Sequence, residues 1–353
     1  MTKRCVVGFL ADLRSGERMK QYDMIARMAF DEGRASGAFD VDVDLHMKEV
    51  EGLPRGSGDD VVAAYKELVD EGAIAVIGPF VTDNCTYLKP TVEKLGVPSI
   101  AWCGASSWLG HWTFSLPNGS LLDEGPYLAA YAHRQGWRRI AVLRDASEIG
   151  ETYWRFFARA AKRYGLEVAS DQIIEPLAVD VSAELRTARE AGADVLVYLG
   201  YGMSLLGVNA ALDGWDVPRL ATTAFVFCYR PQYLPAFEGW SGLDQLDPAN
   251  PQRIAFLAKC RARFDWEPQF MSATLMYDSA RVVAEALGIA PSLTPAGVRE
   301  GLEGVRMLPA ASGGAGTTIS FGHYSHKGWE GPRYLVMGKV RDGVPSFEAY
   351  VDP

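Results

Sequence analysis

Polar side chains that could hold a ligand follow two neighbouring strands of the predicted sheet. The segments Gly78–Asn84 (GPFVTDN) and Trp102–Ser107 (WCGASS) each come directly after a predicted strand. In an open parallel sheet, ligands gather at the carboxyl ends of the strands, where helix N-termini present free N–H groups. Thr82, Asp83 and Ser106 are also residue types that cap helices. Together, the two segments favour a site for a polar or anionic group.

Motifs that carry enzymatic chemistry are missing from the sequence. The first predicted strand is followed by Ala11–Gly16 (ADLRSG), which fails the GxGxxG pattern, and no GxxxxGK[ST] occurs. Gly104–Trp108 (GASSW) has Trp where a nucleophile elbow has its second Gly. His323 and His326 are insufficient for a zinc site, and we interpret them as part of a solvated hairpin. We therefore expect no catalytic residue, no metal and no cofactor.

The composition is that of a folded, acidic protein. The 353 residues are 48% hydrophobic and 22% charged, which favours two compact lobes or one large α/β body. A net charge of -9 argues against binding to nucleic acid. No apolar run approaches the roughly 20 residues that span a bilayer, so we expect no membrane-spanning segment. The five cysteines are scattered without a CxxC pair, which indicates small buried residues. They are Cys5, Cys85, Cys103, Cys228 and Cys260.

Short β-branched runs alternate with amphipathic helical stretches over the first three quarters of the chain. The expected strands are Cys5–Leu10, Val41–Met47, Ile74–Ile77, Ser99–Ala101, Ile140–Leu143, Leu166–Ile174, Val195–Leu199 and Leu220–Thr223. The expected helices are Arg18–Ala35, Asp60–Glu71, Asn84–Leu95, Leu121–Gln135, Glu151–Tyr164, Ser182–Glu190 and Met203–Leu212. Such alternation is typical of a doubly wound parallel sheet, and two series occur, one before about residue 118 and one after it.

The last third of the chain has a different pattern. It reads as three helices, Pro251–Phe264, Met271–Leu287 and Pro295–Glu303, and then as terminal strands joined by turns. The expected terminal strands are Thr317–Phe321, Tyr334–Val340 and Phe347–Val351. The stretch Trp240–Pro251 is rich in Gly, Asp and Pro, and we interpret it as a loop or linker.

These features together resemble a known family, the type I periplasmic binding proteins of the branched-chain amino acid transport class. The residues that carry the resemblance run in the family's order along essentially the whole chain. They are Val76–Pro79 with Thr82, Gly96–Ile100, Gly104–Ser106, Gly136–Leu143, Ile149–Glu151, Ala191–Val195 and the hairpin at Phe321.

The resemblance implies two doubly wound lobes joined by a three-strand hinge, with the ligand clamped between them. Lobe one would comprise residues 1–118 plus 251–328, and lobe two residues 119–250 plus 329–353. Ligand binding would stabilise the closed arrangement of the lobes, and no bond would be made or broken.

The resemblance also implies roles for individual residues. Thr82 matches the hydroxyl that receives the ligand carboxylate, and the segment Gly104, Ala105 and Ser106 matches groups beside it. Tyr201 matches an aromatic residue of lobe two near the ligand.

Two positions depart from the family pattern. Ile149 stands where the family has Tyr, and Thr223 to Phe227 stand where an acidic residue should meet the ligand's amino group. A buried ammonium without a carboxylate partner is costly, so an amino acid ligand would need Asp12 or Asp83 to supply the charge.

We therefore expect a mostly apolar ligand that carries one carboxylate or amide. Aromatic residues would border it, and Arg14, in the loop after the first strand, would meet a carboxylate. The aromatic candidates are Trp102, Trp108, Tyr201, Phe225 and Phe227.

The sequence leaves two functions open. One is the substrate-binding component of an ABC importer, with the importer's membrane subunits as partners. The other is a cytoplasmic ligand sensor of the same fold, with a regulatory protein as partner. The run from Met1 to Asp12 has no secretory leader, which predicts a cytoplasmic location as the sequence stands, or the cell envelope if a leader was removed. The strand starting at Cys5 leaves no room for a helix-turn-helix ahead of it, which argues against a repressor.

Overall fold

The chain forms two compact units. The structure, a computed structural model, describes residues 3–14, 16–223, 234–268, 270–329 and 334–350. Unit 1 comprises Met1–Asn118 and Ala249–Gly331, and unit 2 comprises Gly119–Pro248 and Pro332–Pro353. The chain therefore passes between the units at three places. Among the described residues, none of the helices combines the length and apolar character that a membrane crossing requires.

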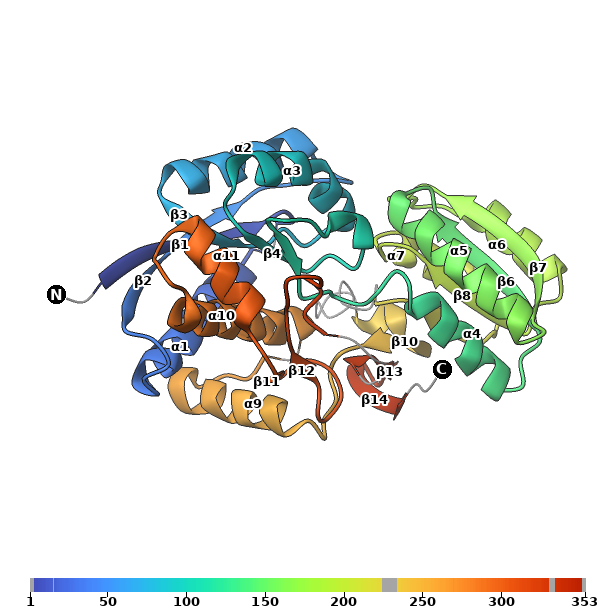
Figure 1. Cartoon of the computed structure of the whole chain (residues 1–353). Helices are drawn as coiled ribbons and strands as arrows, with labels where there is room; N and C mark the ends of the chain where they lie inside the picture. Colours follow the sequence, from blue (N-terminus) through green and yellow to red (C-terminus); the bar gives the residue numbers. More distant parts are fainter. Residues whose placement is uncertain (1–2, 15, 224–233, 269, 330–333, 351–353) are drawn as a thin grey trace. The chain divides into compact units, whose positions relative to one another are not determined.

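Unit 1 is built on a parallel sheet with the strand order β2-β1-β3-β4-β5 (Figure 1). The strands are β1 Lys3–Ala11, β2 Val41–Glu49, β3 Ala73–Ile77, β4 Ser99–Ala101 and β5 Thr113–Ser115. Its central residues, among them Phe9, Ile77 and Ile100, are buried because helices cover both faces. Figure 1 shows α2 and α3 above this sheet and α1 and α10 below it. These helices span Arg18–Ala35 (α1), Gly58–Asp70 (α2), Thr82–Leu95 (α3) and Met271–Ile289 (α10).

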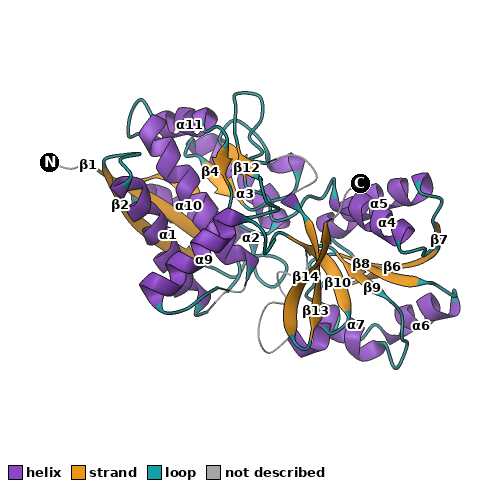
Figure 2. Ribbon diagram, turned by 90° about the horizontal axis from the view of Figure 1, so that it is seen from below, coloured by secondary structure: helices purple, strands orange, loops and turns teal. Residues whose placement is uncertain are grey.

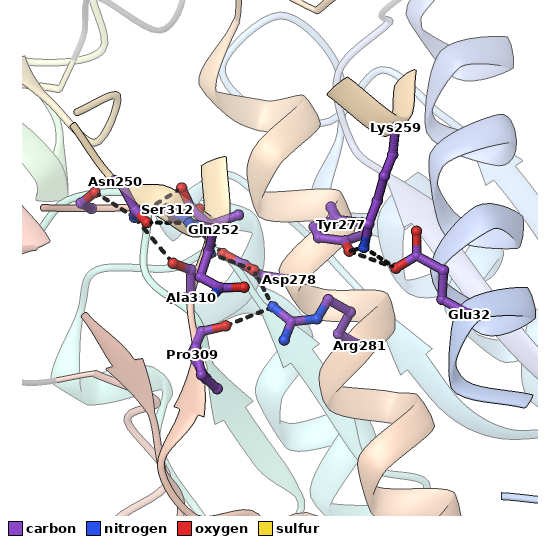
Figure 3. Close-up of polar contacts among 12 residues, drawn as sticks. Glu32, Asn250, Gln252, Lys259, Tyr277, Asp278, Arg281, Pro309, Ala310 and Ser312 are labelled. Atoms are coloured by element: carbon purple, nitrogen blue, oxygen red, sulfur yellow. Dashed lines mark hydrogen bonds and ion pairs between the residues drawn. The ribbon is translucent and has the colours of Figure 1, made fainter. Parts of the chain in front are cut away.

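The C-terminal helices of unit 1 are fixed by buried polar contacts (Figure 3). They are α9 Pro251–Phe264, α10 and α11 Pro295–Gly304, followed by the short pair β11 Leu308–Pro309 and β12 Thr318–Ile319. The carboxylate of Asp278 in α10 accepts the backbone N–H groups of Ala311 and Ser312 at 2.9 and 2.8 Å. The amide nitrogen of Asn250 donates to the carbonyls of Ala310, Ala311 and Gly313. These contacts anchor the segment between the two short strands.

Unit 2 repeats the strand order of unit 1 and extends it. Its sheet runs β14-β13-β10-β9-β8-β6-β7, and Figure 2 shows β13 and β14 beside β10. The strands are β6 Arg139–Asp145, β7 Glu167–Ile174, β8 Val195–Leu199, β9 Arg219–Ala221, β10 Trp240–Asp244, β13 Val336–Arg341 and β14 Val344–Tyr350. The pairs of β13 with β10 and of β14 with β13 are antiparallel, and the other pairs are parallel.

Helices pack on this second sheet around an apolar core. They are α4 Glu124–Arg134, α5 Glu148–Arg163, α6 Ser182–Glu190 and α7 Leu205–Ala211. The core includes Leu143, Leu196, Tyr198 and Trp240, all fully buried. Two sheets of this kind confirm the predicted fold class of doubly wound α/β lobes.

Some sequence-based element predictions are wrong. The stretch predicted as a loop, Trp240–Pro251, contains the buried strand β10 and the first residue of α9. The predicted strand Thr317–Phe321 shrinks to the two residues of β12. β10 forms because β9 and β13 pair with its two edges, which outweighs the weak strand preference of Ser241 and Gly242.

Candidate functional site

The loop after β3 is held by the carboxylate of Asp12, which follows β1. Asp12 accepts the backbone N–H of Phe80 at 2.8 Å and that of Val81 at 3.0 Å, and the side-chain amide of Asn84 at 2.7 Å. It is fully buried, and burial raises its pKa to about 6 while these three hydrogen bonds act in the opposite direction. Asp12 thus builds the loop that begins α3. Its role as a partner of the ligand stays a prediction.

The two predicted binding segments lie together at the carboxyl ends of β3 and β4. The N–H of Trp102 donates to the carbonyl of Pro79 at 3.1 Å, which joins the segments. Thr82, the first residue of α3, is buried, and its Oγ1 lies 3.7 Å from the Sγ of Cys103. Asp83, next in the first turn, is half-buried. The edge of the sheet thus presents a hydroxyl and a carboxyl on one helix start.

The segment after β4 turns through a short 3-10 helix, Ser106–Trp108. Ser106 is exposed, Gly104 is half-buried and Ala105 is buried. The N–H of Ala105 points back to the Sγ of Cys103 at 3.3 Å. Ser106 and its neighbour Ser107, which is also exposed, are therefore hydroxyls of this segment that solvent or a ligand can reach.

Aromatic side chains line the same end of unit 1. Phe80 and Trp102 stack with ring centroids 3.9 Å apart and an interplanar angle of 8°. Trp102 is buried and donates its Nε1–H to Ser279 at 3.0 Å. Phe80 keeps part of its surface exposed. The pair gives the carboxyl end of the sheet an apolar, planar surface.

The structure differs from the expectation at two further aromatic residues, Trp108 and Phe270. Trp108 was expected to border the ligand, but it is fully buried, and its Nε1–H donates to the carbonyl of Phe114 at 2.8 Å. It is therefore a core residue of unit 1. Phe270, which the sequence analysis missed, lies 4.5 Å from the guanidinium of Arg18 at the start of α1. The two residues are 252 positions apart in the sequence and adjacent in the structure, so only the fold could reveal this pair.

Arg14 lies in the exposed part of the loop after β1. Its side chain is 78% exposed, and its Nε lies 4.0 Å from a carboxylate oxygen of Glu51. An ion pair this long and this exposed contributes little to stability. Arg14 thus lies on the solvent side of the loop, with most of its side chain exposed.

In unit 2, Asp145 occupies a position equivalent to that of Asp12. It ends β6 and accepts the N–H of Tyr201 and the hydroxyl of Tyr198, each at 2.7 Å. These contacts hold the loop after β8, in which the predicted ligand residue Tyr201 is buried. Ile149, in the first turn of α5, is buried as well.

The end of β9 is held by Glu124, a residue that the sequence analysis missed. The Glu124 carboxylate accepts the N–H of Thr223 at 2.7 Å, its hydroxyl at 3.1 Å and the Tyr153 hydroxyl at 2.8 Å. Thr223 is buried beside it, whereas the predicted residues Phe225 and Phe227 lie outside the described residues. Burial raises the pKa of Glu124 to about 7, although hydrogen bonds from Thr223 and Tyr153 act to lower it. A buried acid whose pKa is shifted in this way is a common feature of functional sites.

The pair His323 and His326 corrects one further expectation. His326 is buried rather than solvated: its ring stacks on Phe114 at 3.9 Å, and its Nε2 lies 3.2 Å from Glu303. Burial acts to raise the pKa of Glu303, but the hydrogen bond from His326 and the charge of Arg299 hold it below its ordinary value. Within the described ranges, no three His, Cys, Asp or Glu side chains come together as metal ligands do. The His326–Glu303 pair is thus part of the packing of α11.

Comparison with protein families decides what kind of chain this is. A family model described as periplasmic binding protein matches residues 26–331, which is most of the chain. This chain belongs to the periplasmic binding protein family. A comparison with curated proteins found no match.

Solved structures of periplasmic binding proteins share the fold over nearly the full length. A leucine-binding protein from Thermotoga maritima has a TM-score of 0.81 and 18% identity, with 99% of each chain covered. A branched-chain amino acid transporter substrate-binding protein from Streptococcus pneumoniae, in complex with isoleucine, has a TM-score of 0.83 and 19% identity, covering 99% of this chain and 100% of that one. A substrate-binding protein of an ABC transporter from Desulfitobacterium hafniense, in complex with Leu, has a TM-score of 0.78 and 18% identity, covering 98% and 100%. At these identities the likeness establishes the fold of this periplasmic binding protein, and its ligand must be argued from its own residues.

Proposed function

We propose that this chain is a non-catalytic substrate-binding component of an ABC importer. Its two lobes would close around a mostly apolar ligand that carries one carboxylate or amide. Membership of the periplasmic binding protein family supports the binding function. The relatives from Streptococcus pneumoniae and Desulfitobacterium hafniense are described as transporter substrate-binding proteins, which supports the importer as partner.

The ligand class is argued from the residues that follow β9. The stretch from Thr223 to Tyr233, TAFVFCYRPQY, contains no acidic residue, one arginine and four aromatic residues. A buried ammonium group needs a carboxylate partner, because taking it out of water costs several kcal/mol. Of the two carboxylates that the sequence offers as that partner, Asp12 is already occupied by N–H groups of the protein, which leaves the half-buried Asp83 of unit 1. This composition favours a carboxylate or amide on a planar or alicyclic body over the amino acids bound by the relatives.

Unit 1 offers groups that suit such a ligand. The stacked pair of Phe80 and Trp102 would pack against its apolar body. Thr82 and Ser106 would hydrogen-bond its polar end, and Arg14 would attract a carboxylate.

A ligand screen tests the proposal directly. The purified protein is heated with benzoate, cyclohexanecarboxylate, benzamide, leucine or isoleucine, and the melting temperature is recorded. A ligand at 100 times its dissociation constant stabilises the folded state by about 2.7 kcal/mol, which raises the melting temperature by several degrees. We expect a shift with at least one acid or amide and none with the two amino acids. A shift with leucine or isoleucine alone would overturn the proposed ligand class.

A second experiment tests the importer. Uptake of the radiolabelled acid or amide that binds is measured in cells with and without this gene. Loss of uptake in the deletion strain supports an importer component. Unchanged uptake together with altered gene expression would instead identify a ligand sensor.

A further inference from the structure

Tyr22 joins the aromatic residues at the carboxyl end of the unit 1 sheet into one cluster. Its buried ring, on α1, stands edge-on to the rings of Phe80, Trp102 and Phe270, with centroids 6.2, 6.0 and 6.3 Å away. The Tyr22 hydroxyl donates to Ser272 Oγ at 2.8 Å, and this bond ties α1 to the first turn of α10. Rings from two loops and from the starts of two helices therefore meet around one tyrosine.

Phe80 and Phe270 are the rings of this cluster that keep exposed surface. Both are half-buried, whereas Tyr22 and Trp102 are buried. Because Trp102 stacks on one face of Phe80, the exposed surface of Phe80 belongs to its other face and its edge. The planar guanidinium of Arg18 covers Phe270 in the same way, 4.5 Å from the ring centroid. Each exposed ring is therefore backed by a planar group and offers the rest of its surface to solvent or a ligand.

The stacked pair of Phe80 and Trp102 is held in a fixed position. The backbone N–H of Phe80 donates to Asp12 at 2.8 Å, and the Nε1–H of Trp102 donates to Ser279 at 3.0 Å. The fully buried ring of Phe9 packs against Phe80, with centroids 5.6 Å apart. Rings held at the backbone and at their faces cannot turn to fit a ligand of another shape. The surface is therefore preorganised, and it binds most tightly the ligand body whose shape it already matches.

A planar aromatic ring matches this surface better than a saturated ring does. Aromatic pairs gain affinity beyond what their buried area provides, because the positive edge of one ring meets the negative face of the other. A saturated six-membered ring lacks this charge distribution, and its chair form departs from a plane. By buried area alone the saturated ring would bind at least as tightly, because it carries more apolar surface. A preference for the planar ring would therefore report on contact with the aromatic cluster.

We propose that this cluster selects an aryl ligand, whose planar ring packs on Phe80 and Phe270. Phe80 is the main determinant of this specificity, because its ring is backed by Trp102 and fixed through its backbone. Phe270, backed by Arg18, adds to it. The inference rests on the proposed function and deepens it, because that function left planar and alicyclic bodies equal. It concerns the body of the ligand and is independent of the polar group that the ligand carries.

Matched pairs of probes test the aryl preference. Each pair carries one polar group on a planar or a saturated ring: benzoate and cyclohexanecarboxylate, benzamide and cyclohexanecarboxamide, phenylalanine and cyclohexylalanine. Isothermal titration calorimetry measures the affinity of the purified full chain for each probe. In every pair that binds, we expect the planar member to bind about three- to tenfold more tightly than the saturated one. A saturated member that binds as tightly as its planar partner, or no binding of any of the three aromatic probes, would overturn the proposal.

Single substitutions assign the preference to the two exposed rings. Phe80→Leu keeps an apolar side chain but removes the ring, so the ratio of the two affinities should fall to about one, mainly through weaker binding of the planar probe. Phe270→Leu should lower the ratio by a smaller factor. Tyr324→Leu, at a position of unit 1 that is 99% exposed, should keep the wild-type ratio. Circular dichroism checks that each variant folds, and if Phe80→Leu does not, the wild-type ratio and Phe270→Leu decide. A folded Phe80→Leu protein that keeps the wild-type ratio would overturn the role of Phe80.

The polar groups of the probes separate this inference from the proposed function. Binding confined to the pair of phenylalanine and cyclohexylalanine would overturn the proposed carboxylate or amide ligand, whereas the ratio within that pair would still decide the aryl preference. Conversely, cyclohexanecarboxylate that binds more tightly than benzoate would agree with the proposed ligand class and would overturn the aryl preference. The two proposals therefore fail on different measurements.

Discussion

The two units use the same device at the first strand of their sheets. In the shared order β2-β1-β3-β4-β5 and β7-β6-β8-β9-β10, Asp12 follows β1 and Asp145 ends β6. Each carboxylate accepts backbone N–H groups from the loop after the adjacent strand, at Phe80 and Val81 in unit 1 and at Tyr201 in unit 2. One buried acid therefore shapes the equivalent loop in both units.

The units differ at the fourth strand of the shared order. In unit 1, side-chain donors hold the loop after β4 by its carbonyl groups. Lys89 Nζ donates to the carbonyls of Ser107 and Leu109, at 2.6 and 2.8 Å. The Ser115 hydroxyl donates to the carbonyl of Cys103. In unit 2, the end of β9 is held by an acceptor, Glu124. The equivalent loops are thus fixed by opposite means, by a donating ammonium and hydroxyl in unit 1 and by an accepting carboxylate in unit 2.

The largest expected effect comes from breaking the shared device. Asp12→Ala removes the acceptor of three donors, the N–H groups of Phe80 and Val81 and the side-chain amide of Asn84, and should lower the free energy of unfolding by about 3–5 kcal/mol. Asp145→Ala should have an effect of the same order, because it frees the N–H of Tyr201 and the hydroxyl of Tyr198. Urea denaturation measures the loss in the free energy of unfolding for each variant, and hydrogen exchange shows which of the two units loses protection. Asp60→Ala, at an exposed position of α2, is the control for Asp12. Asp12→Ala as mild as this control would mean that the loop finds other acceptors.

A smaller effect is expected from the pH dependence of the two units. Burial raises the pKa of Glu124 from 4.5 to about 7 and that of Asp12 from 3.8 to about 6. The folded state then binds more protons than the unfolded state between the two values, so stability falls as pH rises through this window. Each group should contribute a loss of roughly 3 kcal/mol in total.

Single substitutions show which unit causes the loss of stability in each of the two pH ranges. Relative to Glu124→Gln, the wild type should lose stability until about pH 7, and relative to Asp12→Asn until about pH 6. Chemical denaturation at a series of pH values measures both difference curves. Curves that end at the same pH would remove the distinction between the units. A wild-type curve that rises relative to Glu124→Gln would mean that the hydrogen bonds to Glu124 outweigh its burial.

Sequence patterns were sufficient for elements whose ends carry local signals. The helix α9 was predicted at Pro251–Phe264, as observed, because Asn250 caps it and Pro251 suits its first turn. The segments Gly78–Asn84 and Trp102–Ser107 were correctly expected to meet, since both follow neighbouring parallel strands. What the predictions captured is therefore local chemistry and the topology that it implies.

Residues defined by distant contacts escaped prediction. Glu124 looked like an ordinary first-turn acid of α4, and its contact with Thr223 spans 99 positions. His326 was expected in a solvated hairpin, but its ring stacks on Phe114, far away in the sequence. Tryptophan is a residue type that occurs in binding sites as well as in cores. Only the burial of Trp108 in the folded chain shows that it is a core residue. A single sequence does not encode such pairings in any short pattern.

The smallest effect on stability, yet a clear one on binding, is expected for Arg14. Its exposed side chain and its 4.0 Å distance from Glu51 indicate that Arg14→Ala changes the free energy of unfolding by less than about 0.5 kcal/mol. Its affinity for an acid that shifts the melting temperature should nevertheless fall about tenfold, or 1.4 kcal/mol by the relation of affinity to free energy. Isothermal titration calorimetry measures this, with Arg55→Ala, another exposed arginine of unit 1, as the control.

The comparison of acid and amide makes the Arg14 prediction specific. A carboxylate gains a charge-assisted hydrogen bond from a guanidinium, whereas an amide gains only an ordinary one. Arg14→Ala should therefore lower the affinity for benzoate much more than the affinity for benzamide. Equal losses for the two would mean that Arg14 acts through the shape of the loop and not through its charge. No loss for either would place the ligand away from the loop after β1, and the charge partner of an acid would then have to come from another part of the chain, with Arg18 of α1 the next residue to substitute.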